Sequence, residues 1–174
     1  MIKKIVFGGG CFWCTEAVFN ILKGVKNTIP GYAGGIKPNP SYEEVCNDGT
    51  GHAEVLMIEY EERELSLNTL LEVFFEMHDP TSLNKQGADA GTQYRSAIYY
   101  YDEVQKKEIE MFIEQKQRIF DKKIVTEVKK LDEFYPAEEY HKKYYSKNKE
   151  QPYCSYVITP KVEKIKKEFK KFIK

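Results

Sequence analysis

The 174-residue sequence has no net charge and no long apolar run. Lysine and arginine total 27, as do aspartate and glutamate, so no overall field favours nucleic acid or a membrane surface. No apolar stretch approaches the roughly 20 residues that a membrane-spanning helix needs. The opening MIKKIVFGGG has too few apolar residues before glycine for a secretory signal. We therefore expect a cytoplasmic protein with neither nucleic-acid nor membrane partners.

Cysteine is scarce, and its pattern excludes a disulfide scaffold. The four cysteines are Cys11, Cys14, Cys46 and Cys154. Static disulfides do not persist in the reducing cytoplasm, so metal binding or redox catalysis is the better interpretation. A zinc site would need a second C-x-x-C or a suitably spaced histidine pair, and the sequence has neither. We therefore expect no metal.

The C-x-x-C of Cys11 and Cys14 leaves other interpretations open. It could be the dithiol of a thioredoxin-like disulfide oxidoreductase, although that fold usually places the motif after a β-α-β lead, and here one strand precedes it. It could belong to a non-catalytic redox sensor. The two cysteines could also be buried at a helix start as small hydrophobic side chains.

The length and composition suit a single globular domain, and we expect a monomer. With 41% hydrophobic and 14% aromatic residues, a chain of this length can bury a stable core without disulfide bonds or structural metal ions. No repeat, low-complexity segment or linker interrupts residues 1–174. We expect one domain over the whole chain.

Hydrophobic periodicity and capping signals predict alternating strands and helices. Capping residues are expected at Ser41, with Glu44 three positions on, at Ser66 and at Asp102. The order β-α-β-β-α-β indicates an α+β fold with a ferredoxin-like split β-α-β core, a mixed sheet and extra C-terminal helices. The predicted strands are 2–7, 25–35, 52–60, 96–101 and 123–131, and the predicted helices are 12–23, 41–45, 67–78, 103–119, 136–147 and 159–173.

The stretch GGGCFWCTE places Cys11 where a strand ends and a helix begins. Free backbone N–H groups and the helix dipole favour an anion there, so we expect a lowered pKa and a usable thiolate. The glycines would let the backbone approach a ligand closely. Phe12 and Trp13 would form an apolar wall beside the sulfur.

A second group of polar residues indicates an enzyme. GTGHAEV puts Glu54 on a strand after glycines, and a carboxyl beside an apolar slot would have a raised pKa and could act as an acid. An ordinary solvent-facing glutamate is the plainer interpretation, and His52 is expected to be a structural hydrogen-bonding residue. The long loop 79–94 adds Asp89 and Tyr94, and loops of that length are usually functional.

The motifs together closely resemble the A type of peptide methionine sulfoxide reductase. The resemblance rests on GGGCFWCTEAVF, GYAGG, PSYEEVCNDGTGHAEV, HDPTSLNKQGADAGTQYRSAIYY and PYCSYVITPK, and covers residues 4 to 162. It implies an α/β roll around a split β-α-β core. It also implies reduction of the S epimer of methionine sulfoxide, free or in proteins, with no metal or organic cofactor.

The resemblance also implies a role for each site residue. Cys11 would attack the sulfoxide sulfur, Phe12 and Trp13 would hold the substrate methyl group, and Glu54 would protonate the oxygen. Tyr42 and Tyr94 would hydrogen-bond that oxygen, with Asp89 in support. Cys11 would become a sulfenic acid, and a second thiol would form a disulfide that thioredoxin reduces. Cys154 is the first candidate for that thiol, Cys14 the second, and Cys46 is expected to be structural.

Overall fold

The structure is a computed structural model that describes residues 1–47 and 49–174. Its strands are β1 (Ile2–Gly8), β2 (Val25–Ala33), β3 (Ala53–Glu61), β4 (Lys85–Gln86), β5 (Asp89–Ala90), β6 (Ala97–Tyr100), β7 (Glu127–Lys130) and β8 (Phe134–Pro136). Its helices are α1 (Phe12–Phe19), α2 (Tyr42–Cys46), α3 (Leu67–Met77), α4 (Glu103–Gln117), α5 (Tyr144–Lys147) and α6 (Thr159–Glu168). Shorter helical turns are η1 (Thr92–Tyr94), η2 (Glu139–His141), η4 (Lys170–Phe172) and the π-helix η3 (Cys154–Ile158).

Within the described residues, one six-stranded sheet has the order β7-β6-β1-β3-β2-β8. Its inner strands β6-β1-β3-β2 are all antiparallel neighbours, with α1 connecting β1 to β2 and α3 lying between β3 and β6 in the chain. This is the split β-α-β arrangement. The strand β7 runs parallel to β6, which makes the sheet mixed. The predicted fold class is therefore confirmed.

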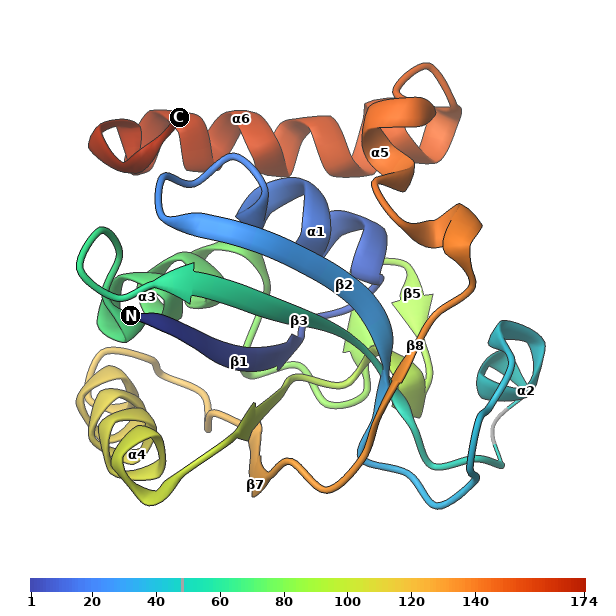
Figure 1. Ribbon diagram of the computed structural model, residues 1–174, viewed down its shortest axis with the longest axis horizontal. Helices are drawn as coiled ribbons and strands as arrows, with labels where there is room; N and C mark the ends of the chain where they lie inside the picture. The colour runs from blue at the N-terminus through green and yellow to red at the C-terminus, as the bar shows by residue number, and fades with distance from the viewer. Residues whose placement is uncertain (48) are drawn as a thin grey trace.

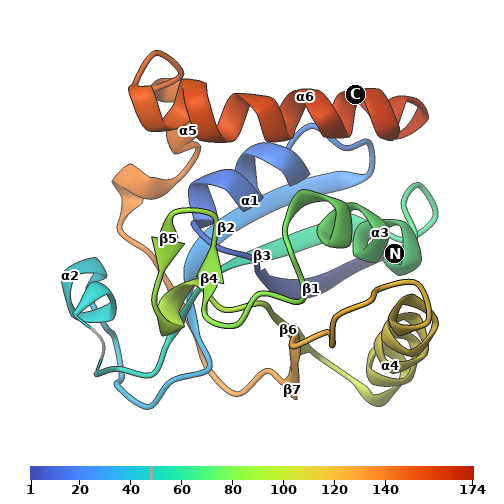
Figure 2. The same cartoon turned by 180° about the vertical axis from the view of Figure 1, so that it is seen from behind.

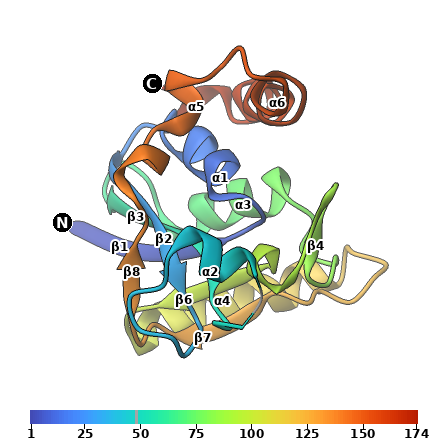
Figure 3. The same ribbon diagram turned by 90° about the vertical axis from the view of Figure 1, so that its right-hand side faces the viewer.

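Helices α1 and α3 cover one face of the sheet, and α6 lies across α1 as an outer layer (Figures 1 and 3). The main core fills the space between them, and in it the ring of Phe7 from β1 stacks on Phe74 from α3 with centroids 4.4 Å apart. Figure 2 shows the same layers from behind, with the β4–β5 hairpin beside the start of α1. The layering leaves the N-terminus of α1 at the border between sheet, hairpin and C-terminal segment.

The predicted helix caps are confirmed. The Ser41 hydroxyl accepts from the Glu44 amide while the Glu44 side chain accepts from the Ser41 amide, which is a full capping box. Ser66 caps α3, and Asp102 caps α4. These caps need only residues within one helical turn, which is why the sequence predicts them.

The predicted end of the first helix is wrong. Helix α1 ends at Phe19 rather than near Lys23, because Leu22 leaves the helix to pair with Ile173 near the C-terminus. Gly24, at φ +90°, then turns the chain into β2. The contact with residue 173 is non-local, so no helix signal in residues 12–24 could reveal it.

Candidate functional site

Cys11 occupies the N-cap position of α1, directly after the glycines that follow β1. Its side chain is half-buried and packs against the main core. The glycines serve close packing inside the protein: a Cβ on Gly9 would lie 2.8 Å from the Phe74 ring, and one on Gly10 would lie 3.0 Å from Gln86. The backbone therefore approaches its own loop and helix.

The expectation that the helix start lowers the pKa of Cys11 is wrong. Burial raises the pKa of the Cys11 thiol well above its usual value, and the nearby Glu54 carboxylate and Cys14 raise it further. The backbone N–H of Trp13, the helix contribution, lowers this pKa by less. Cys11 is thus held as a thiol chiefly because its surroundings are dry.

Glu54 lies at the start of β3 with 1% of its surface exposed. Its Oε1 accepts a hydrogen bond of 3.2 Å from the Phe12 amide, whereas its Oε2 is buried with no partner. Burial raises the pKa of Glu54 to about 8, and the charge on Asp89 adds to the shift. The carboxyl therefore keeps its proton at neutral pH and can donate it from Oε2, as the sequence predicts for a catalytic acid.

Three more predicted residues lie within the electrostatic reach of this pair. The hydroxyls of Tyr42, at the start of α2, and Tyr94, in η1, have pKa values raised by burial and by the Glu54 charge. Asp89, on β5, raises the pKa values of Cys11 and Glu54. The two phenols stay protonated near the carboxyl, and Tyr42 also shares a hydrogen bond with the Cys46 side chain.

Phe12 and Trp13 begin an aromatic cluster at the start of α1. The Trp13 ring stacks on Tyr144 at 3.7 Å with planes 7° apart, and Tyr153 meets it edge-on at 6.0 Å. The ring of the buried Phe12 lies 6.4 Å from that of Tyr42. These rings pack together at the start of α1, directly after Cys11 in the chain. That Phe12 and Trp13 form an apolar wall beside the sulfur stays a prediction.

His141, from η2, contacts these rings and holds Trp13 in position. It is fully buried, and its ring Nδ1 accepts a 3.0 Å hydrogen bond from Trp13 Nε1. Burial lowers the pKa of His141, so the neutral ring remains an acceptor for Trp13. Its Nε2 and the Oε2 of Glu54 are the two buried side-chain atoms without a hydrogen-bond partner in residues 1–47 and 49–174.

The remaining cysteines lie in different surroundings. Cys14 is buried one turn into α1, with its Sγ 3.7 Å from the Tyr153 hydroxyl. Cys154 is wholly buried in the main core at the first position of η3, and its charge affects Cys14. Cys46 is half-buried on α2 and acts on the pKa of Tyr42. All four cysteines are free thiols.

Three residues of the cluster, His141, Tyr144 and Tyr153, are not among the site residues predicted from the sequence. Tyr153 stands next to Cys154 in PYCSYVITPK, and its hydroxyl donates a 2.6 Å hydrogen bond to Asp89 Oδ2. A tyrosine beside a candidate redox cysteine was the available signal. His141 had no comparable signal, because only the fold brings it to Trp13. His52, by contrast, has the expected structural role, since its ring bonds Gly35 and Lys37.

A groove of about 560 Å³ opens beside the site. Asp89 and Tyr153 are among its lining residues, and the exposed Tyr156, together with Val157 and Pro160, gives it an apolar part. Because Asp89 and Tyr153 belong to both, the groove is continuous with the site around Cys11.

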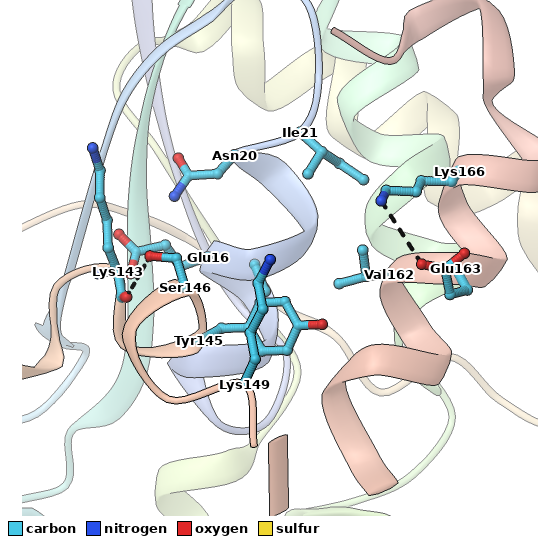
Figure 4. A pocket seen from close by; sticks show the side chains of 11 residues that line it. Glu16, Asn20, Ile21, Lys143, Tyr145, Ser146, Lys149, Val162, Glu163 and Lys166 are labelled. Carbon is cyan, nitrogen blue, oxygen red and sulfur yellow. Dashed lines mark hydrogen bonds and ion pairs between the residues drawn. The ribbon is translucent and has the colours of Figure 1, made fainter. Parts of the chain in front are cut away.

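A separate pocket of about 220 Å³ lies between α1, α5 and α6 (Figure 4). There the buried Glu16 carboxylate accepts hydrogen bonds from the Lys143 amide at 2.6 Å and the Thr28 hydroxyl at 2.9 Å. These bonds fasten the segment that follows His141 to α1. The bonds in this pocket thus help to hold the chain segment that carries His141. None of the predicted site residues lines the pocket.

Two further observations concern the metal sites and the membrane-spanning helices that the described residues could form. No group of three or more His, Cys, Asp or Glu residues among those described is arranged to hold a metal ion. No helix in the same part of the chain is long and apolar enough to span a membrane.

Comparisons with known proteins agree with the geometry. A family model described as peptide methionine sulfoxide reductase matches residues 3–173. A peptide methionine sulfoxide reductase MsrA from Nautilia profundicola is 56% identical over 98% of this chain and 99% of its own. The reduced form of Mxr1 from Saccharomyces cerevisiae has a TM-score of 0.82 at 37% identity, covering 88% of this chain and 89% of its own.

A further crystal structure holds Mxr1 from Saccharomyces cerevisiae in complex with Trx2. It is 27% identical to this chain with a TM-score of 0.60, covering 81% of this chain and 84% of Mxr1. The family match spans nearly the whole chain and includes the thiol, carboxyl and aromatic residues described above. The chain therefore belongs to the peptide methionine sulfoxide reductase family.

Proposed function

We propose that the chain reduces the S epimer of methionine sulfoxide to methionine and so repairs oxidised proteins. The observation that carries the proposal is the unpartnered, buried Oε2 of Glu54 close to the half-buried Cys11 thiol. A sulfoxide offers a complementary pair of atoms, because its oxygen is a strong acceptor and its sulfur is electrophilic.

Glu54 acts as the general acid. With its pKa raised to about 8, it carries a proton at neutral pH and donates it to the sulfoxide oxygen. Tyr42 and Tyr94 donate hydrogen bonds to the same oxygen, since their raised pKa values keep both hydroxyls protonated. Burial keeps the pKa of Glu54 high, and Asp89 supports the site by adding to this shift.

Cys11 is the nucleophile. The positive sulfur of the bound, protonated sulfoxide favours the thiolate, which offsets the burial that keeps free Cys11 protonated. The sulfur of Cys11 attacks the sulfoxide sulfur, and the oxygen ends on Cys11 as a sulfenic acid. Methionine leaves reduced by two electrons, Cys11 is oxidised by two, and the Cys11 proton restores Glu54.

Phe12 and Trp13 hold the methyl group of the substrate. Their rings form the apolar wall next to Cys11, and Tyr144 and His141 fix the Trp13 plane from two directions. A methyl group on this wall orients the sulfur, so that one epimer places its oxygen at Glu54 and the other does not.

The groove ending at Asp89 and Tyr153 receives the residues that flank an oxidised methionine in a protein. Its apolar side at Tyr156 and Val157 suits extended peptide. Free methionine sulfoxide would use only the inner end.

A second thiol reduces the sulfenic acid to a disulfide, with Cys154 and Cys14 as the candidates, and thioredoxin then reduces the disulfide. The similar Mxr1 was crystallised in complex with Trx2. We further propose that the reaction uses no metal or organic cofactor, and that residues 1–174 form one domain active as a cytoplasmic monomer without nucleic-acid or membrane partners.

The test is methionine release from the separate S and R epimers, with dithiothreitol and then with thioredoxin. We expect release from the S epimer with both reductants and none from Cys11→Ser, whose circular dichroism should match the parent. Equal release from both epimers, or appreciable activity in Cys11→Ser, would contradict the proposal. Activity with dithiothreitol but not thioredoxin would leave the first step intact and refute thioredoxin as the reductant.

A further inference from the structure

The Tyr153 hydroxyl connects Cys14 to Asp89. It donates its proton to Asp89 Oδ2 at 2.6 Å and lies 3.7 Å from Cys14 Sγ. A phenol has one proton, so with that proton on Asp89, Cys14 S–H must be the donor to the Tyr153 oxygen. The result is a directed chain of donors from Cys14 through Tyr153 to the carboxylate of Asp89.

Cys14 is also the thiol that α1 holds beside Cys11. The Cys14 amide donates to the Cys11 carbonyl at 3.0 Å, and the Cys14 charge acts on Cys11. Side chains three positions apart on a helix have Cβ atoms about 5–6 Å apart, against about 3.5–4.5 Å in a disulfide. Cys11 has the extended φ and ψ of an N-cap, so it can close this gap without unwinding the helix.

Cys154 is buried in the main core, as Cys14 is, but it lies at the start of a π-helix. The Thr159 hydroxyl donates a hydrogen bond of 3.1 Å to the Cys154 carbonyl and so holds that segment of backbone. Cys154 raises the pKa of Cys14. A direct Cys11–Cys154 bond would require this helical segment to leave the core, whereas a Cys11–Cys14 bond requires one side chain to turn.

We propose that Cys14 is the residue that resolves the Cys11 sulfenic acid and that Tyr153 and Asp89 take its proton. The inference rests on the proposed reductase function. The Cys14 sulfur attacks the sulfur of Cys11–SOH, and the Cys14 S–H proton passes through Tyr153 to Asp89. The hydroxyl leaves Cys11 as water with a proton from Glu54, and the Cys11–Cys14 disulfide forms. No further oxidant is required, because the sulfoxide has already oxidised Cys11.

The peptide map of this chain distinguishes the two resolvers directly. Trypsin cleaves after lysine and arginine, so residues 5–23 carry both Cys11 and Cys14, and residues 150–161 carry Cys154. The protein is reacted with one equivalent of the S epimer of methionine sulfoxide in the absence of reductant. It is then alkylated and digested with trypsin, and the peptide masses are measured by mass spectrometry. We expect peptide 5–23 to be lighter by two hydrogen atoms and unalkylated, with methionine released. A cross-link between 5–23 and 150–161 in its place would overturn the proposal.

Variants in which one cysteine at a time is replaced by serine test the assignment of the resolving cysteine. Cys14→Ser should release one methionine per chain and then stop with a sulfenic acid on Cys11 that dimedone traps. Cys154→Ser, and Cys46→Ser as the matched control, should form the same disulfide within 5–23. If Cys154→Ser instead accumulates the sulfenic acid, Cys14 is not the resolver. If no variant and no parent protein releases methionine, the proposed reductase function itself has failed.

The proton path has its own test. Tyr153→Phe keeps the ring beside Trp13 but removes the link to Asp89, so disulfide formation at neutral pH should slow by about 10²-fold, the usual scale of general acid–base help. The defect should shrink as pH rises, because Cys14 then ionises without the path. A purely structural role would instead lower the rate of methionine release and disulfide formation equally at every pH, and that outcome would refute the path.

Discussion

The amide of Phe12 donates a hydrogen bond to Oε1 of Glu54 across 42 positions of sequence. This bond fixes the carboxyl by one oxygen and leaves Oε2 buried without a partner, next to Cys11. An unsatisfied buried carboxyl oxygen costs free energy in the absence of substrate. The buried Oε2 is thus available to bond a sulfoxide oxygen.

The pH dependence of turnover should follow Glu54. The carboxyl acts in its protonated form, and its pKa is raised to about 8, so the rate should be level near neutral pH and fall as pH rises through about 8. Glu54→Gln should be about 10²-fold slower, with residual rate from the hydrogen bonds of Tyr42 and Tyr94, and should lose this descending limb. Single-turnover methionine release against pH measures both. A variant as fast as the parent protein would exclude Glu54 as the acid.

The same carboxyl should limit stability at high pH. The unfolded chain loses the Glu54 proton near its usual pKa of 4.5, and the folded chain keeps it until about 8, so its contribution to stability falls between these values as pH rises. Glu54→Gln should therefore raise the free energy of unfolding at pH 9 by about 2–4 kcal/mol and much less at pH 4. Urea unfolding at the two pH values checks this. An equal effect at both would show that ionisation is not the cause.

The hydrogen bond from Trp13 to His141 should be visible in fluorescence, because Trp13 is the one tryptophan in the chain. His141 has a lowered pKa, so acid must reach below its usual 6.5 before Nδ1 gains a proton and turns from acceptor to competing donor. We expect the emission intensity to change with a midpoint below that value, and His141→Phe to abolish the change. An unchanged titration in His141→Phe would assign the signal to another group.

Substrates of different size should separate the groove from the reaction centre. Tyr156 is 81% exposed and lines the groove but not the site around Cys11. Tyr156→Ala should lower kcat/KM for a peptide containing methionine sulfoxide by about 3–10-fold, the loss of one aromatic contact, while free methionine sulfoxide is reduced at the parent rate. Ile119→Ala removes an exposed apolar side chain just after α4, outside the groove, and is the control. Equal losses for both substrates would rule out a peptide groove at Tyr156.

The sequence by itself determined what depends on neighbours along the chain. Capping at Ser41, Ser66 and Asp102 needs only atoms within one helical turn, and these caps are as predicted. The order of the long strands and helices, and the placement of Cys11 at a helix start, likewise follow from local pattern, whereas the short strands β4, β5 and β8 are not predicted. The motifs around Cys11 and Glu54 were specific enough to indicate the family that the comparisons establish.

The tertiary structure alone decided the chemistry of those groups. A helix start predicts a lower pKa for Cys11, yet burial and Glu54 reverse it, because the cost of removing a charge from water depends on everything that covers the group. Likewise His141 reaches Trp13 across 128 positions, and Tyr153 reaches Asp89 across 64. Contacts at that separation exist only once the chain has closed around them, so local sequence could name Cys11 and Glu54 but not the residues that set their environment.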